Sequence, residues 1–203
     1  MLRILVVAIV AVGMGALLGA GDGLLPVRSG VVGVGVFMLG AVLVRRRWLG
    51  APHAAPGSPE QALWLALAAN ACVGGYLAAM LLRIGPEFAM HTPLVHRFGI
   101  ETWTLVIGSA VASWIARDPE PREDERDHVI AARGQKVAYS GLVGLLVLLI
   151  LALGFVEDGW IGAWSRPGIA HGLILAILLS VVFGILSRLL DYARDHAESD
   201  VLS

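Results

Sequence analysis

Long apolar runs alternate with short polar stretches along the whole chain, and this alternation predicts the architecture. Six runs carry few or no charges over a length close to that which a helix needs to cross a bilayer. The predicted spans are about 2–20, 30–44, 61–82, 100–116, 137–156 and 167–188. Lipid offers no hydrogen-bond partners, so every backbone N–H and C=O inside the bilayer must be hydrogen-bonded within the protein. We therefore expect an all-α fold, a polytopic membrane helix bundle of about six transmembrane helices.

The polar stretches divide the chain into four predicted regions. A four-span N-terminal half (1–116) precedes a charged juxtamembrane hinge (117–136), a two-span C-terminal hairpin (137–190) and a polar tail (191–203) that we expect to fray. The first run also fits a signal peptide, but Leu18 before Gly19 and Ala20 makes a poor cleavage site. The sequence therefore favours a retained first span.

Composition supports the membrane class independently of any motif. The 203 residues are 57% hydrophobic and 15% charged, with a mean hydropathy of +0.77, which is more apolar surface than a soluble core of this size can bury. A net charge of -1 without a basic patch argues against a nucleic-acid partner. The expected partners are the lipid bilayer and either a second copy of the chain or another membrane protein.

The hinge is the one long polar segment between apolar runs, and its charge order is that of a helix start. Pro119 and Pro121 stand where a helix can begin, acidic residues follow in the first turn, and basic residues come later. This helix is expected to continue into the fifth span. The candidate partner-binding residues are Asp124, Glu125, Arg126, Asp127 and Arg133. The alternative is a solvated juxtamembrane helix without a partner.

A resemblance rests on the same residues. Asp124 to Asp127, then Ile130, Arg133 and Ala138-Tyr139 at the start of an apolar run, resemble the motif of several uncharacterised families of small prokaryotic predicted membrane proteins. In those families a DER-type acidic helix precedes a closing pair of spans. The resemblance covers about 117–194 and implies a membrane protein, with no activity attached.

Small residues recur at intervals of four on two spans, a pattern typical of close helix contact. On the sixth span they are Gly168, Gly172, Ala176, Ser180 and Gly184. On the third span they are Ala62, Ala66, Asn70, Gly74 and Ala78. The sixth-span stripe is expected to pack either inside the monomer or across a homodimer.

A few polar side chains inside spans are candidates for a polar path. Asn70 lies near the middle of its span, where an unpaired amide is costly, so we expect it to bond to a neighbouring helix or to line a cavity. The full predicted lining is Asn70, Thr104, Ser109 and Ser180. Such a lining is typical of a small-solute permease or the membrane subunit of a transporter.

The predicted loop between the third and fourth spans offers a weaker candidate. Glu87, His91, His96 and Glu101 are metal-ligating types, but Pro93 between the histidines prevents a helical ligand geometry. An ordinary exposed loop is favoured over metal binding or pH sensing. The single cysteine, Cys72, excludes a disulfide framework and a cysteine metal site.

Lys and Arg are distributed unequally between the two sides of a six-span topology. Eleven fall on the side of both termini and the hinge, against four on the other side: Arg28, Arg83, Arg97 and Arg166. The positive-inside rule then places both termini in the cytoplasm of a prokaryotic cell, with the chain in its inner membrane.

The sequence contains none of the common catalytic or nucleotide-binding motifs, which weighs against an enzyme. The sequence has no Walker loop, HExxH, GxSxG or CxxC, and nothing in it implies a cofactor or an enzyme. It also lacks ionisable residues near the span centres, where coupled transporters usually carry them. The favoured function is therefore an accessory or regulatory, partner-binding membrane protein, and the alternative is the permease or transporter subunit.

Overall fold

The computed structural model describes residues 1–21, 27–50, 58–85, 92–117, 124–155 and 164–202. Within these ranges the chain forms six α-helices and no strand. The helices are α1 (Leu2–Ala20), α2 (Ser29–Gly50), α3 (Ser58–Ile84), α4 (Pro93–Ile115), α5 (Glu125–Phe155) and α6 (Arg166–Leu202). All six are long and apolar enough to cross a membrane, which confirms the predicted all-α, six-span fold.

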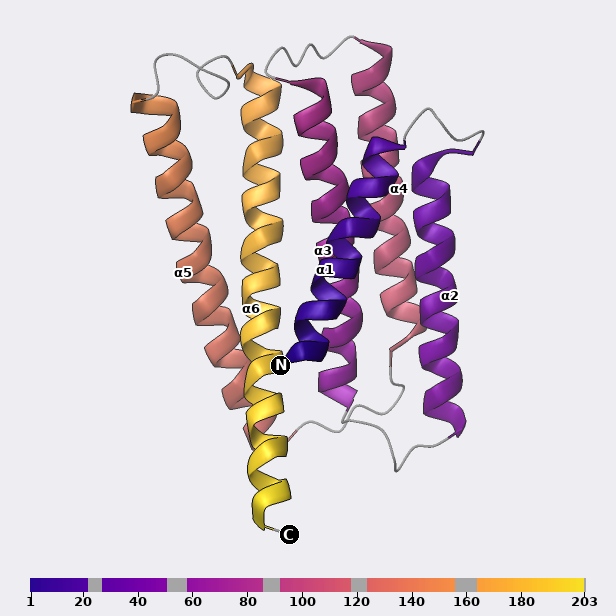
Figure 1. Cartoon of the computed structure of the whole chain (residues 1–203), viewed down its shortest axis with the longest axis vertical. Coiled ribbons are helices and arrows are strands. Elements are labelled where there is room, and N and C mark those ends of the chain that lie inside the picture. The colour runs from indigo at the N-terminus through magenta and orange to yellow at the C-terminus, as the bar shows by residue number, and fades with distance from the viewer. Residues whose placement is uncertain (22–26, 51–57, 86–91, 118–123, 156–163, 203) are drawn as a thin grey trace.

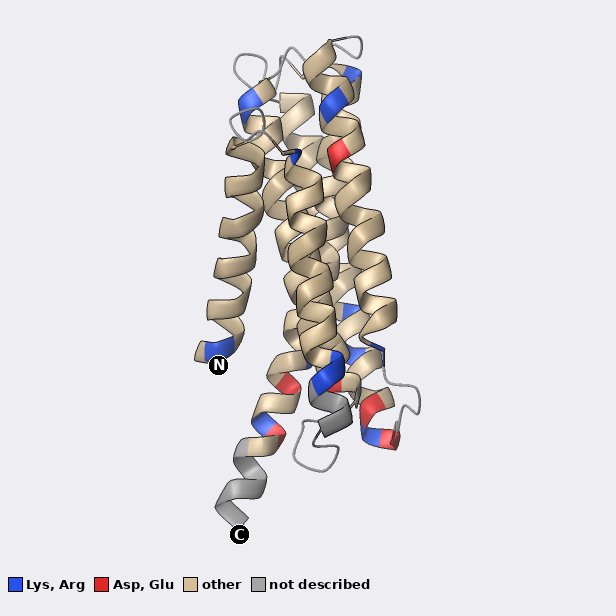
Figure 2. Cartoon of the chain, turned by 90° about the vertical axis from the view of Figure 1, so that its right-hand side faces the viewer, with Lys and Arg blue, Asp and Glu red and all other residues tan. Residues whose placement is uncertain are grey.

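The helices stand side by side as an elongated bundle, with α5 at one edge and α2 at the other (Figure 1). In order of packing, α5 contacts α6, α6 contacts α3, α3 contacts α1 and α4, and α4 contacts α2. Both chain termini lie toward the same end of the bundle, here called the terminal end, and the opposite end is the far end. Charged residues gather at these two ends and leave the middle uncharged (Figure 2), as a bilayer core requires.

Two glycines let α1 and α3 touch backbone to backbone. A Cβ on Gly15 would lie 1.9 Å from the carbonyl oxygen of Cys72, and a Cβ on Gly75 would lie 2.3 Å from that of Val12. The predicted small-residue stripe on α3 contains the adjacent Gly74 instead, and Gly74 has open space around it. The close contact therefore uses the neighbouring face of α3, one residue along from the prediction.

From Glu125 onward, the predicted hinge and the fifth span form one unbroken helix, α5. Gly134, an unfavourable residue inside a helix, is buried where α5 crosses α6. A Cβ there would lie 2.9 Å from the carbonyl oxygen of Gly184 and 2.3 Å from Cγ of Arg188, so the crossing requires a glycine. The prolines at 119 and 121, which were expected to start this helix, lie outside the described residues.

The predicted stripe on α6 faces the interior of the monomer along most of its length. Gly168, Ala176, Ser180 and Gly184 are buried, and Gly184 meets Gly134 and Ala138 of α5. Gly172 is half-buried, and a Cβ added to it would lie 2.6 Å from the indole ring of Trp164.

Two predicted boundaries are wrong. The helix α4 begins at Pro93, with the Thr92 hydroxyl accepting a hydrogen bond from the Val95 amide at 3.4 Å, so His96 is helical rather than part of a loop. The tail was expected to fray from residue 191, but α6 continues to Leu202. Asp191 is buried there, since α5 and α6 remain in contact beyond the apolar stretch. Glu87 and His91 lie outside the described residues.

Two apolar cores hold the bundle together. The larger one lies mainly among α1–α4 and includes the fully buried Tyr76 and Phe98, whose ring centroids are 6.1 Å apart. The second lies at the terminal end and joins the two predicted halves of the chain. Its buried members are Ile4, Leu63, Leu67, Ile130, Ile185, Leu189 and Tyr192.

Candidate functional site

The predicted hinge residues lie at the terminal end, where the first turns of α5 meet the last turns of α6. The backbone N–H of Asp127 donates to Oδ1 of Asp124 at 2.8 Å, and the backbone N–H of Asp124 donates to Oδ2 of Asp127 at 3.0 Å. This reciprocal pairing satisfies amides that have no partner within the helix, as a capping box does. Asp124 and Asp127 therefore fix the start of α5.

The same first turn of α5 is joined to α6 by polar contacts. The hydroxyl of Tyr192 donates to Oδ1 of Asp127. The guanidinium of Arg126 donates from Nε to Oδ2 of Asp195 at 2.7 Å, and its Cζ lies 5.9 Å from the Tyr192 ring centroid, a distance at which a cation still interacts with an aromatic face. Two hinge charges are thus paired within the molecule.

One helical turn nearer the apolar stretch, a buried carboxylate lies between two arginines. Nη1 of Arg133 is 3.2 Å from Oδ2 of Asp191, and Nη1 of Arg194 is 3.9 Å from Oδ1 of the same residue. The Asp191 side chain is only 9% exposed, and the two arginines offset the cost of burying this carboxylate.

These contacts lie beyond the apolar stretches of both helices. At 31 and 37 residues, α5 and α6 are about 46 and 55 Å long, well beyond a hydrocarbon core of about 30 Å. Burial raises the pKa of the Asp127 carboxyl, but the hydrogen bonds from Tyr192 and Asp124 outweigh it and leave the pKa below its usual value. Burial and the adjacent Asp127 raise the pKa of Tyr192, so an ionised carboxylate accepts from a protonated hydroxyl at neutral pH.

Beside these contacts lies a small cavity of about 310 Å³, here called the polar pocket. It is lined by Arg126, Val129, Ile130, Arg133, Asp191, Arg194 and Asp195. Arginines outnumber aspartates by three to two, so the lining carries one net positive charge.

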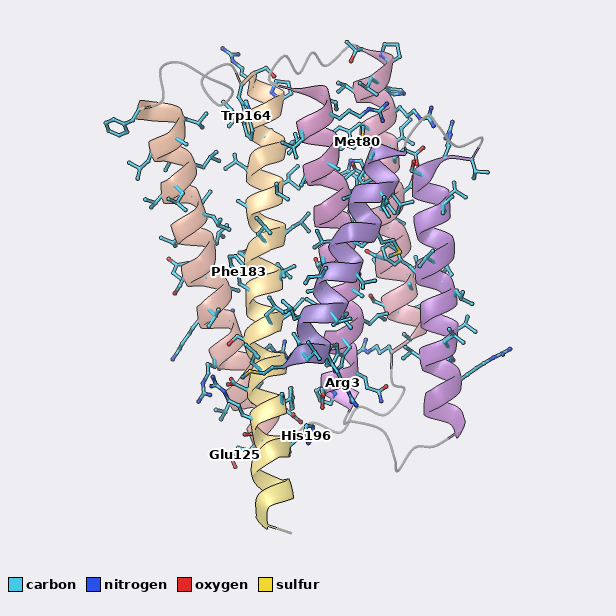
Figure 3. All side chains as sticks on the ribbon, viewed as in Figure 1. Arg3, Met80, Glu125, Trp164, Phe183 and His196 are labelled. Atoms are coloured by element: carbon cyan, nitrogen blue, oxygen red, sulfur yellow. The ribbon has the colours of Figure 1, made fainter. Side chains whose placement is uncertain are left out.

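The end of α6 is also tied to α3. Nε2 of His196 lies 3.0 Å from Oε2 of Glu60, and the indole N–H of Trp64 donates to Oε1 of Glu60 at 3.2 Å. Figure 3 shows His196 and Glu125 at the terminal end of the bundle. The terminal end of α6 is therefore held by both α5 and α3.

Of the five hinge residues that the sequence singled out, Arg126, Asp127 and Arg133 face α6, Asp124 caps α5 and Glu125 is exposed. The sequence reasoning missed their partners on α6 because it treated 191–203 as a frayed tail. A detectable signal was present: Ile185 and Leu189 lie on the buried face of the apolar stretch, and Tyr192 continues their helical spacing beyond it.

The predicted polar lining does not converge on one site. Each of its four side chains donates to a carbonyl of its own helix: Asn70 to Ala66 at 2.8 Å, Thr104 to Ile100 at 2.8 Å, Ser109 to Val106 at 2.8 Å and Ser180 to Ile177 at 2.7 Å. The expected bond from Asn70 to a neighbouring helix is therefore replaced by one within α3. Thr104 alone among the four lines a mostly apolar groove of about 820 Å³ between α2, α4 and His171.

Glu101, which the sequence offered only as a weak metal-ligand candidate, is instead a buried carboxylate near the far end. Glu101 is 1% exposed; its Oε2 accepts the Gly30 N–H in the first turn of α2, and its Oε1 lies 4.0 Å from Nε of Arg28. A carboxylate at a helix N-terminus is favoured by the helix dipole. Phe98, Glu101 and Leu105 share the buried face of α4, so helical spacing was the available signal. The described residues contain no group of three or more metal-ligating side chains.

Together these observations define a multi-pass α-helical membrane protein with a network of ion pairs between α5 and α6 at its terminal end. No family model, curated protein or solved structure matches the chain. The resemblance to prokaryotic families with a DER-type helix therefore stays a prediction.

Proposed function

We propose that this protein is an accessory or regulatory protein of the prokaryotic inner membrane that binds another membrane protein along α5. One observation carries the proposal. Within the described chain, α6 is the helix against which α5 packs closely, and none of the residues in the most apolar stretch of α5 is buried.

The side of α5 away from α6, here called the outward face, is a continuous exposed line at helical spacing. Its residues are Glu125, Val129, Ala132, Lys136, Tyr139, Val143, Val147 and Ile150. Charges occupy the terminal end of this face and apolar side chains the rest. Lipid tails can cover the apolar part, whereas a membrane protein that projects beyond the bilayer can contact both parts.

Charge placement favours a different protein over a second copy of this chain. A parallel dimer in a membrane has its twofold axis along the membrane normal, so identical residues meet at equal depth. A dimer through the outward face would bring Glu125 toward Glu125 and Lys136 toward Lys136, and such like-charge pairs are destabilising. A partner with the opposite charge order avoids this repulsion.

The excess of Lys and Arg at the terminal end favours a cytoplasmic position for both termini and for the α5–α6 contacts. The charged part of the outward face then lies at the cytoplasmic surface. A small-solute permease has weaker support, since Asn70, Ser109 and Ser180 satisfy their donors within their own helices.

The test is the native mass of the protein purified in mild detergent from its own host. We expect a stoichiometric second protein with the wild type, and its loss when Val143→Trp and Val147→Trp add bulk to the outward face. The matched control carries Val36→Trp and Leu39→Trp on the exposed face of α2 and should keep the second protein. A wild-type homodimer or lone monomer, or equal capture by both double variants, would contradict the proposal.

A further inference from the structure

The polar pocket between α5 and α6 has the chemistry of an anion site. Its three arginine side chains remain 49%, 60% and 64% exposed for Arg126, Arg133 and Arg194, although each lies near an aspartate. A guanidinium carries five N–H donors, and one carboxylate engages at most two of them in a fork. Donor capacity therefore remains on the arginines that surround this pocket.

The two aspartates position the arginines rather than neutralise them completely. Asp195 holds Arg126 through Nε at 2.7 Å, and Asp191 holds Arg133 at 3.2 Å. Both arginine contacts of Asp191 are ion pairs without a hydrogen bond, and the contact of Arg194, at 3.9 Å, is the longer of the two. Arg194 is therefore the arginine best able to turn toward a bound anion, while the other two are already oriented.

The depth of the pocket matches that of lipid phosphates. Arg133 precedes the apolar stretch that starts at Val137 by about one helical turn, or about 6 Å. Val129 and Ile130 give the pocket an apolar wall that can contact the glycerol and upper acyl carbons of a lipid. Basic pockets between transmembrane helices at this depth are typical sites for anionic headgroups.

We propose that the polar pocket binds the phosphate group of an anionic phospholipid, with Arg194, Arg126 and Arg133 as its donors. Arginine suits this ligand because its planar fork matches two phosphate oxygens. The site lies at the junction of α5 with α6 and shares only Val129 with the outward face. Its arginines lie outside that face, so the proposal does not depend on the proposed partner. It is also independent of which side of the membrane the terminal end faces.

The experiment places the full chain in nanodiscs of equal parts phosphatidylglycerol and phosphatidylcholine and records the lipids retained in native mass spectra. We expect preferential retention of phosphatidylglycerol by the wild type. Arg194→Gln should reduce that retention at least about fivefold, since it removes a charged donor while Asp191 keeps Arg133. Asp195→Asn should increase retention, because it removes a competing carboxylate and raises the net positive charge of the pocket.

Lys136→Gln is the matched control, since it removes one positive charge from an exposed position on α5 outside the pocket lining. Its retention should equal that of the wild type. A second arm adds inorganic phosphate to lipid-free detergent samples and follows thermal unfolding. Phosphate could raise the thermal stability of the wild type but not of Arg194→Gln, while the nanodiscs show no selective lipid retention. That combination would identify free phosphate, rather than a lipid, as the ligand of the pocket.

Several outcomes would overturn the proposal. One is equal retention of the two lipids by the wild type together with no response to phosphate. Another is an equal loss of lipid in Arg194→Gln and Lys136→Gln, which would indicate general charge attraction. A third is reduced phosphatidylglycerol retention by Asp195→Asn. If the ion pairs served only to hold the helices together, both Arg194→Gln and Asp195→Asn would weaken lipid retention.

Discussion

Gly74 and Gly75 are neighbours on α3 but have different surroundings, and this contrast shows what close helix contact demands of one residue. A Cβ on Gly75 would lie 2.3 Å from the backbone oxygen of Val12, whereas a Cβ on Gly74 would meet nothing within 4 Å. Backbone atoms cannot rotate away as a side chain can. The separation of α1 and α3 therefore depends on the missing side chain at Gly75.

We expect Gly75→Ala to lower the free energy of unfolding by about 1–3 kcal/mol, because α1 must move away from α3. Gly74→Ala should leave it unchanged or raise it by up to about 1 kcal/mol, since alanine favours the helix. Denaturant unfolding in detergent micelles, followed by helical circular dichroism, measures both. Equal effects of the two substitutions would contradict the described contact.

At the scale of elements, α5 and α6 are joined by two kinds of contact. Near the apolar stretch, Gly134 and Gly184 bring the two backbones together. Beyond it, ion pairs and the hydrogen bond between Tyr192 and Asp127 continue the contact. The pair of Arg133 with the buried Asp191 should matter most, because removal of the cation leaves a buried carboxylate less compensated.

A double-mutant cycle on Arg133→Gln and Asp191→Asn tests this pair. We expect Arg133→Gln to destabilise the wild type more than it destabilises the Asp191→Asn background. The coupling should be at least about 0.5 kcal/mol, kept modest because the arginine is 60% exposed and screened by solvent. A parallel cycle on Glu125→Gln and Lys136→Gln, both exposed on α5, should show no coupling. Equal coupling energies in the two cycles would contradict the expectation that the buried Asp191 depends on Arg133 for stability.

At the scale of the whole molecule, the arrangement separates an uncharged middle from two charged ends. Both termini share one end, as an even number of spans requires. The side of the membrane on which they lie follows only from the unequal distribution of Lys and Arg in the sequence.

Cysteine labelling in intact cells of the host tests that orientation. The native Cys72 is fully buried and should not react with a membrane-impermeant maleimide. Arg166→Cys at the far end should be labelled in intact cells, whereas Glu125→Cys should be labelled only after the membrane is permeabilised. Both substituted positions are exposed, so access to solvent does not differ. The opposite labelling pattern would place the terminal end outside the cell.

Sequence reasoning located part of the candidate site. It selected the hinge from its charges and identified Arg126, Asp127 and Arg133, but it assigned their partners Asp191, Tyr192 and Asp195 to a frayed tail. Hydropathy falls at residue 191, and a polar segment at the end of a chain usually frays. Whether such a segment remains helical and packed depends on a neighbour far away in sequence.

The sequence by itself determined the class of fold, because the length of an apolar run and its lack of charge are local properties that decide whether a helix can cross a bilayer. It also marked the α6 stripe of small residues. The tertiary structure alone decided which glycine of α3 meets α1, which carboxylates are buried, and that three arginines surround one pocket. These features arise from contacts between residues more than fifty positions apart, such as Arg126 with Asp195. Local spacing cannot encode which helices become neighbours.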